Sequence, residues 1–173
     1  MHGLVAPSTT IAALINPANA PQSAIERKII QDAARVLDTH FLVLNASSPD
    51  EIESAFTTIV GERIGALVVS GENFFLTQRD LLVTLAARHA VPTMYPYREF
   101  TVAGGLISYG TDIVGAYRQL GANTARILHG AKTTDLPVQQ STKVELVINL
   151  KTAKILGLTI PIPLLGRADE VIE

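Results

Sequence analysis

The chain has 173 residues, a length that suits one compact domain with a substantial core. Apolar residues make up 47% and charged residues 17%, which excludes an intrinsically disordered chain, and no apolar run is long enough to span a bilayer. The 14 basic and 16 acidic residues give a net charge of −2, which argues against nucleic acid as a partner.

Two features that the sequence lacks limit the possible chemistry and location of the chain. The chain has no cysteine, so disulfides, thiolate metal sites and cysteine nucleophiles are excluded. Its first ten residues, MHGLVAPSTT, lack the basic and long apolar regions of a secretory signal peptide. We therefore expect the chain, if expressed as written, to remain in the cytoplasm.

Short β-like runs alternate with helical stripes over the first hundred residues, a pattern typical of βαβ units and a parallel sheet. The predicted strands are 11–15, 41–44, 66–69 and 91–94. Asn19 is expected to cap a helix between the first two strands. That helix is predicted to bury one apolar stripe, formed by Ile25, Ile29, Ala33, Val36 and Leu37.

Two more helices follow in this part of the chain. Ser48-Pro49-Asp50-Glu51 is a capping box with proline at the first helical position, and the helix it opens is expected to bury Ile52, Ala55, Phe56 and Ile59. Residues 70–73 are expected to form a turn. Thr77 with Asp80 is then predicted to cap a third helix through Leu81, Leu82, Leu85 and Ala86.

The alternation of β-like runs with helical stripes weakens after residue 98. We expect a helical turn at 98–103, a short strand at 106–109, and a long helix that ends at Gly130. The apolar face of the long helix is predicted from Ile113, Ala116, Tyr117, Leu120, Thr124, Ile127 and Leu128. A polar linker containing Pro137 would lead to a strand at 144–148 and a short helix, capped by Asn149, that runs through Leu156 to a stop at Gly157. The tail, with Pro161 and Pro163, is expected to lie along the surface before a last turn near 168–172.

These elements predict a single α/β domain, 1–173, with a three-layer Rossmann-like architecture: a mostly parallel sheet flanked by helices. Residues 10–110 would form the core βα units, residues 111–140 the long helix and linker, and residues 141–173 a terminal βα unit and tail.

Polar and aromatic side chains follow each of the first five predicted strands. Ligands of open parallel sheets bind beyond the carboxyl ends of the strands, so we expect these groups to recognise a small polar or aromatic solute. They are Asn16 with Asn19, Asn45 with Ser47, Ser70 to Asn73, Tyr95 with Tyr97 and Arg98, and Tyr109 with Gly110 to Asp112.

Turn and cap chemistry is the stronger explanation for Asn16-Pro17 and Ser47. A turn does not require two tyrosines and an arginine, however, and Tyr95, Tyr97 and Arg98 are the groups that a pocket uses to stack on a solute and clamp a carboxylate.

No catalytic constellation stands out. The chain has no GxGxxG after the first strand, no phosphate-binding P-loop and no GxSxG elbow. The four histidines, His2, His40, His89 and His129, are scattered, and structural roles are expected for the last three, which fall at or near helix ends. We therefore predict no catalytic residue, no metal site and no cofactor. An enzyme on a doubly wound fold remains an alternative, for which the fold alone is no evidence.

Four segments carry a resemblance to a known family. They are VPTMYPYREFTVAGGLISYGTD from Val91, YRQLGANTARILHGAKTTDLPVQQSTKVELVINLKTAKILGLTIP from Tyr117, and the upstream IAALINPANAPQS and GALVVSGENFF. Together they strongly resemble the ABC transporter substrate-binding proteins of the group that includes the tryptophan-binding TrpX-like proteins.

The resemblance implies a type I periplasmic binding protein, in which two Rossmann-like lobes close on a solute and present it to a membrane permease. An aromatic amino acid would be one such solute, and the location would be periplasmic. The resemblance places ten residues toward the pocket: Asn16, Ser70, Gly71, Glu72, Tyr95, Tyr97, Arg98, Tyr109, Gly110 and Asp112.

Family members are about twice as long, so the chain resembles the second lobe and C-terminal segments without the first lobe. The long helix, 112–129, packs on the first lobe in that pattern, and its apolar face would here be uncovered. We therefore expect a homodimer, formed through this helix or by its exchange. A cytoplasmic ligand-sensing or assembly module on the same fold is the alternative.

Overall fold

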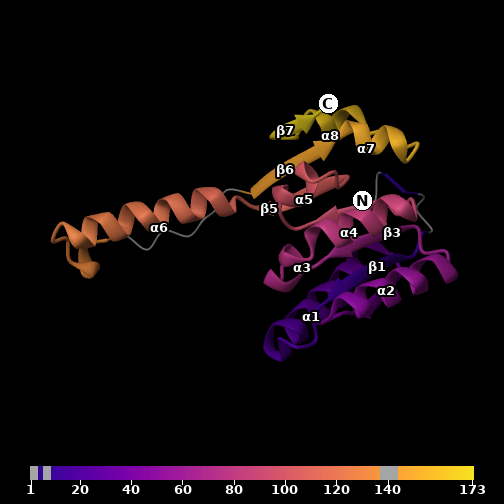
Figure 1. Ribbon diagram of the computed structural model, residues 1–173, viewed down its shortest axis with the longest axis horizontal. Coiled ribbons are helices and arrows are strands. Elements are labelled where there is room, and N and C mark those ends of the chain that lie inside the picture. Colours follow the sequence, from indigo (N-terminus) through magenta and orange to yellow (C-terminus); the bar gives the residue numbers. More distant parts are fainter. Residues whose placement is uncertain (1–3, 6–8, 137–143) are drawn as a thin grey trace.

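A computed structural model describes residues 4–5, 9–136 and 144–173, and its strands form one mixed sheet in the order β2-β1-β3-β4-β5-β6-β7 (Figure 1). The strands are β1 Ile11–Ile15, β2 Phe41–Asn45, β3 Ala66–Val69, β4 Thr93–Tyr95, β5 Ile107–Thr111, β6 Val144–Asn149 and β7 Glu170–Ile172. All neighbouring pairs are parallel except β5 with β6, which is antiparallel. The predicted α/β class with a mostly parallel sheet is therefore confirmed.

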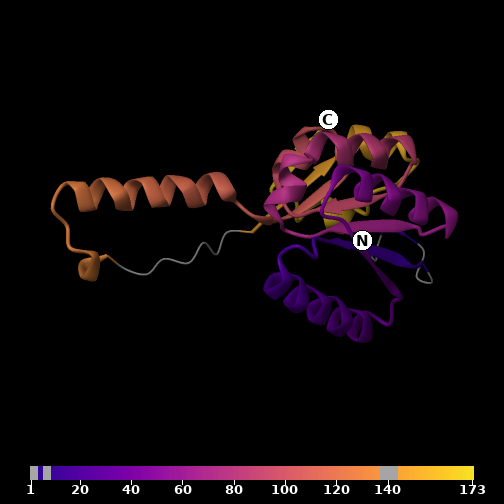
Figure 2. The same ribbon diagram turned by 60° about the horizontal axis from the view of Figure 1, so that its bottom comes forward.

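Helices cover both faces of this sheet. They are α1 Ala20–Leu37, α2 Pro49–Gly61, α3 Asn73–Thr77, α4 Arg79–Arg88, α5 Arg98–Val102, α6 Ile113–Leu128, α7 Leu150–Ile155 and α8 Ile162–Leu165, with a 3₁₀ turn, η1, at Thr133–Asp135. Because successive side chains of a strand point to opposite faces, β1 contributes to both layers. Ala12 and Leu14 pack in the core with α2 and α4, whereas Ala13 and Ile15 lie toward α1, on the opposite face of the sheet (Figure 2).

Two apolar cores hold the sheet and helices together. The larger one contains Phe56 of α2, Phe75 of α3 and Leu82 of α4, each no more than 1% exposed, together with the inward residues of β1 and β3. The second joins β5 and β6 to the C-terminal helices through Ile148, Ala153 and their neighbours. The C-terminal segments therefore belong to the same folded body as the first five strands.

The predicted helix starts are confirmed at two places. The Ser48 hydroxyl accepts a hydrogen bond from the Glu51 backbone N–H at 3.3 Å, and the Glu51 carboxylate accepts one from the Ser47 N–H at 2.6 Å. At the start of α7, Asn149 Oδ1 accepts from the Thr152 N–H at 3.1 Å. These bonds satisfy N–H groups that a helix leaves without intrahelical partners.

The predicted buried stripe of α1 is wrong. Ile25, Ile29 and Val36 are 55%, 60% and 84% exposed. The side turned toward the sheet instead carries the buried Ser23 and the half-buried Glu26 and Ile30. Polar contacts favour this rotation of the helix: Arg27 donates to Asn45 Oδ1 at 2.7 Å, and Asn19 donates to Glu72 rather than capping the helix.

The segment after β3 also differs from the prediction. Residues 70–72 of the predicted turn at 70–73 are non-helical, but Asn73 begins the short helix α3, which was not predicted and which lets Phe75 enter the larger core. Thr77 does not cap α4, since its hydroxyl donates to the Phe74 carbonyl at 2.7 Å. The helix begins after Gln78, which makes no side-chain capping bond.

The tail is more regular than the sequence suggests. Pro163 lies in the first turn of α8, where proline is tolerated, so the tail does contain a helix. The predicted last turn near 168–172 is instead mostly strand β7, which pairs with β6. Asp169 fixes its start, because its carboxylate accepts from the Leu146 N–H and its own N–H donates to the Leu146 carbonyl, both at 2.8 Å.

The long helix α6 projects away from the body, as both views show (Figures 1 and 2). None of its residues is buried, so the predicted apolar face exists but nothing in the described chain covers it. Tyr117 is 70% exposed and Leu120 is 60% exposed. Within the described residues, none of the helices combines the length and apolarity that a membrane crossing requires. Pro137 and the rest of the predicted linker beyond residue 136 lie outside the described residues.

Replacing Ser48 with alanine tests the cap of α2. Ser48→Ala removes the acceptor for the Glu51 N–H, and we expect the free energy of unfolding to fall by about 1 kcal/mol in urea denaturation. Ser54→Ala is the matched control, because Ser54 is exposed in the same helix and only donates back to the Asp50 carbonyl. Its effect should stay within about 0.5 kcal/mol, and equal losses in both variants would contradict the assigned cap.

Candidate functional site

The carboxyl ends of β1, β3, β4 and β5 lie at one edge of the sheet, because these strands are parallel neighbours. Parallel sheets place their ligand sites at this edge. We call the groups gathered there the edge site, and they come from the loops that follow β1, β3 and β4 and from Gly110 within β5. The edge site consists of Asn16, Asn19, Ser70, Gly71, Glu72, Tyr97 and Gly110.

Two side-chain hydrogen bonds join three of these loops. The Tyr97 hydroxyl, after β4, donates to the Gly71 carbonyl, after β3, at 3.0 Å. The Asn19 amide, after β1, donates to Glu72 Oε1 at 3.1 Å. Both bonds span residues far apart in the sequence, so the edge site is held in place without a ligand.

Two glycines let the loops approach each other closely. A Cβ at Gly110 would lie 1.9 Å from the Pro96 carbonyl oxygen, a distance that no side chain tolerates. At Gly71, a Cβ would lie 3.3 Å from the Tyr97 hydroxyl. Glycine at these positions therefore brings β5 against the β4 loop and keeps the Gly71 carbonyl within reach of Tyr97.

The edge site is electrostatically negative. Burial raises the pKa of Tyr97 above its ordinary value, and the nearby carboxylates Glu72, Glu26 and Glu99 raise it further. Burial also raises the pKa of Glu26, with a further contribution from Glu72. This arrangement favours a solute that presents a positive charge or a hydrogen-bond donor to this edge.

Glu26 lies beside the edge site, close enough to Tyr97 and Glu72 to affect pKa values there, and the sequence did not predict this position. It lies on α1, not in a loop after a strand, and was therefore outside the set of strand ends. The available signal was helical spacing: Ser23, Glu26 and Ile30 stand at i, i+3 and i+7, which places them on one face of a helix.

Arg98 occupies a different position from the one expected for a carboxylate clamp. Its guanidinium is hydrogen-bonded to the Glu170 carboxylate of β7, and its Nε lies 4.0 Å from Glu145 Oε2 of β6. The glutamates raise the pKa of Arg98. In this conformation Arg98 ties α5 to the last two strands, and its charge is already compensated within the chain.

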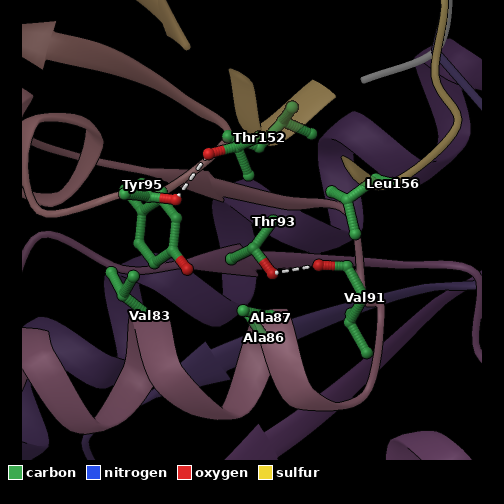
Figure 3. Close-up of a pocket in the computed structure, with 11 residues that line it drawn as sticks. Val83, Ala86, Ala87, Val91, Thr93, Tyr95, Thr152 and Leu156 are labelled. Carbon is green, nitrogen blue, oxygen red and sulfur yellow. Dashed lines mark hydrogen bonds between the residues drawn. The ribbon is translucent and has the colours of Figure 1, made fainter. Parts of the chain in front are cut away.

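Tyr95 lies in the core, 1% exposed, rather than at the expected strand edge. Its ring stacks on Phe100 with centroids 4.8 Å apart, and burial raises the pKa of its hydroxyl. A cavity of about 10 Å³ next to it, drawn in Figure 3 with Thr93 and Thr152, has room for about one water molecule. This cavity is too small for an organic solute.

The remaining predicted residues are spread around the edge. Asn16 is 8% exposed, and its Oδ1 accepts from the Ala18 N–H at 3.0 Å, which is turn chemistry. Tyr109 is 57% exposed on β5. Asp112 caps α6 by accepting from the Gly115 N–H at 2.8 Å. The edge site therefore contains part of the predicted set, and Tyr95, Arg98 and Asp112 have evident structural positions.

The described part of the chain contains no cluster of metal ligands. No group of three or more histidine, cysteine, aspartate or glutamate side chains could hold a metal ion there. His89 stacks on Phe56, with ring centroids 6.1 Å apart, and His129 bonds the Ala125 carbonyl near the end of α6. His2 lies outside the described residues.

Comparison with known families matches residues 4–172 to the family described as ABC transporter substrate binding protein. The chain belongs to this family. Comparison with curated proteins gives no match. Members of the family are substrate-binding proteins and not enzymes, which confirms that expectation and removes the doubly wound enzyme from consideration.

Three solved structures share the fold. An ABC domain from Streptococcus pneumonia in complex with L-Trp is 26% identical with a TM-score of 0.84, over 99% of this chain and 59% of that one. A conserved domain protein from Vibrio cholerae is 24% identical, with a TM-score of 0.79, over 94% and 54%. A ligand-free, open substrate-binding protein with adhesive properties from Clostridium difficile is 19% identical, with a TM-score of 0.67, over 95% and 55%. The chain thus spans between half and three fifths of the length of these neighbours.

Replacing Gly110 tests the close approach at the edge site. In Gly110→Ala the new methyl group would meet the Pro96 carbonyl, so β5 and the β4 loop must separate, and we expect a loss of roughly 1–3 kcal/mol in unfolding free energy. Gly121→Ala is the matched control, because a Cβ there meets nothing within 4 Å. Thermal unfolding should show a lowered midpoint for Gly110→Ala alone, and unchanged stability in that variant would mean that the two loops are not in contact.

Proposed function

We propose that the chain is the solute-binding component, or one lobe of it, of an ABC uptake transporter and that it binds a small organic solute such as an aromatic amino acid. The observation that carries this proposal is the edge site. In a chain of the substrate-binding family, the loops after three parallel strands bring amides, hydroxyls and a carboxylate together.

An aromatic amino acid suits the groups at this edge. The relative from Streptococcus pneumonia was solved with L-Trp, at 26% identity to this chain. Glu72 offers an acceptor for an α-ammonium group, and the half-buried Tyr97 offers a ring beside it. The α-carboxylate would need donors from elsewhere, since Arg98 is engaged by Glu145 and Glu170.

The proposal includes a membrane permease that receives the solute. Proteins of this family are normally periplasmic or extracellular, and we expect this chain to act on that side of the cytoplasmic membrane. In this proposal the edge site binds the solute, and the permease then receives the solute at that side of the membrane.

We also propose that the chain forms a homodimer through α6. Residues of its apolar face, among them Val114, Tyr117, Leu120 and Leu128, are between 42% and 81% exposed. The helix spans about 24 Å, so pairing two copies would remove a long apolar strip from water. A ligand-sensing or assembly module is the second candidate function, and this uncovered helix is the observation that favours it.

Tryptophan titration tests the solute. The chain contains no tryptophan, so selective indole excitation reports only the added ligand. We expect the emission of L-tryptophan to shift to shorter wavelength when protein is added, because the indole leaves water. An emission spectrum that protein does not change would exclude L-tryptophan as a ligand of this chain.

A charge-removing variant locates the binding. Glu72→Gln keeps the size of the side chain but removes its charge, and we expect the Kd for L-tryptophan to rise roughly tenfold or more. Glu62→Gln is the matched control, since Glu62 is exposed at the end of α2, and its Kd should equal that of the unmodified chain. Equal affinity in all three proteins would place the ligand away from the edge site.

Light scattering tests the dimer. At micromolar concentration we expect twice the mass of one chain, and Leu120→Glu should give a monomer because it places a charge in the apolar strip. Ala122→Glu introduces the same charge about half a turn away on the helix and should remain dimeric. A monomeric mass for the unmodified chain, or dissociation by both variants, would contradict an interface on this face of α6.

A further inference from the structure

A second opening lies beneath α1, on the face of the sheet rather than at its edge. Its floor is formed by Ala13 and Val68, and its roof by Ile29 and Ile30 of α1. The volume is about 220 Å³, well above the roughly 10–15 Å³ that one water requires. It is smaller than the roughly 300–1,000 Å³ of pockets for drug-sized ligands, so the occupant must be small. We call this opening the α1 groove.

The groove exists because α1 packs on the sheet with a partly polar face. Ile25 points largely to solvent, and Ile29 lines the opening but is still 60% exposed, so the helix fills little of the space over β1 with apolar atoms. Ala13, which faces this space, is one of the smallest side chains available. Most of the remaining wall is apolar, with Ile15 and Phe41 among its residues.

The α1 groove has polar groups at one end. Glu26, Ser70 and Gly71 line it there. Glu26 Oε2 and the Ser70 hydroxyl oxygen are both buried and complete no hydrogen bond of good geometry within the described chain, although the Ser70 hydroxyl lies near enough to Glu26 to lower the pKa of that carboxyl. Glu26 Oε1 accepts only a long bond, 3.4 Å, from Gln22. A buried carboxylate can accept several hydrogen bonds, so even with the Ser70 hydroxyl beside it Glu26 has acceptor positions left for a further donor from the opening.

The charges around Glu26 and Ser70 indicate which kind of hydrogen-bond donor would suit them. Glu72 lies close enough to raise the pKa of Glu26, so the end of the groove is negative. The neighbouring cation, Arg27, is directed to Asn45 Oδ1 at 2.7 Å. A primary ammonium group has three N–H donors and one positive charge, and can therefore serve Glu26 and Ser70 together.

We propose that the α1 groove binds a small aliphatic primary amine, with its ammonium group between Glu26 and Ser70 and its apolar chain between Ile30 and Ala13. This site goes beyond the proposed solute site. It shares Ser70 and Gly71 with the edge site but opens under α1, and its occupant has no carboxylate or aromatic ring.

Isoleucine methyl NMR on the full chain, with n-hexylamine as the probe at neutral pH, tests the groove. We expect concentration-dependent shifts of the Ile29 and Ile30 methyl signals, which line the groove. The methyl signals of Ile52 and Ile59, in the core on the other side of the sheet, should stay in place. Hexanoate has the same chain but the opposite charge and should cause no shift. Equal shifts with hexanoate or with 1-hexanol would overturn the proposal, because the apolar chain alone would then explain binding.

Two variants test separately the charge of Glu26 and the open volume of the α1 groove. Glu26→Gln should raise the Kd for hexylamine roughly tenfold or more, whereas Glu53→Gln, at an exposed site on α2, should leave it unchanged. Ala13→Ile should abolish the shifts by filling the groove, and the Ile52 and Ile59 signals report whether either variant is folded. Unchanged binding in Glu26→Gln or in Ala13→Ile would refute the site. Because Glu72→Gln tests the edge site separately, loss of tryptophan binding and loss of amine binding can be told apart.

Discussion

The parallel pairing of β1, β3, β4 and β5 is the constraint on which the functional features of this structure depend. It brings to one edge the loops that follow these strands, although the residues are up to about ninety positions apart in sequence. Hydrogen bonds from Tyr97 to Gly71 and from Asn19 to Glu72 then fix the loops relative to each other. Glycine at position 110 is required because the same pairing drives β5 against the Pro96 carbonyl.

Local signals in the sequence predicted much of this fold, because the physical causes lie within a few residues. The Ser48–Glu51 cap, the Asn149 cap and the buried run of β3 are each determined by neighbours in the chain. Strand β7 was missed because a three-residue strand has too short a pattern to detect, and its pairing depends on a distant carbonyl of Leu146.

The site was harder to predict, since a position after a strand does not determine where a side chain points. Tyr95 was expected at the edge, yet it is the last residue of β4 and packs inward on Phe100. Arg98 was expected to meet a solute carboxylate, but its partners Glu145 and Glu170 are 47 and 72 residues away in the sequence. The rotation of α1, which brings Glu26 to the sheet, depends on the contact between Arg27 and Asn45.

Charge links the edge site to the α1 groove. Glu72 at the edge and Glu26 at the polar end of the groove are close enough to affect each other, and both lie near Tyr97. With Arg98 compensated by Glu145 and Glu170, the cation beside this region does not neutralise it. Each carboxylate can be stabilised by a positive charge, and a cation that neutralises one lowers the repulsion felt by the other. An ammonium group bound at either proposed site would therefore relieve part of the same electrostatic cost, because Glu26 and Glu72 repel each other.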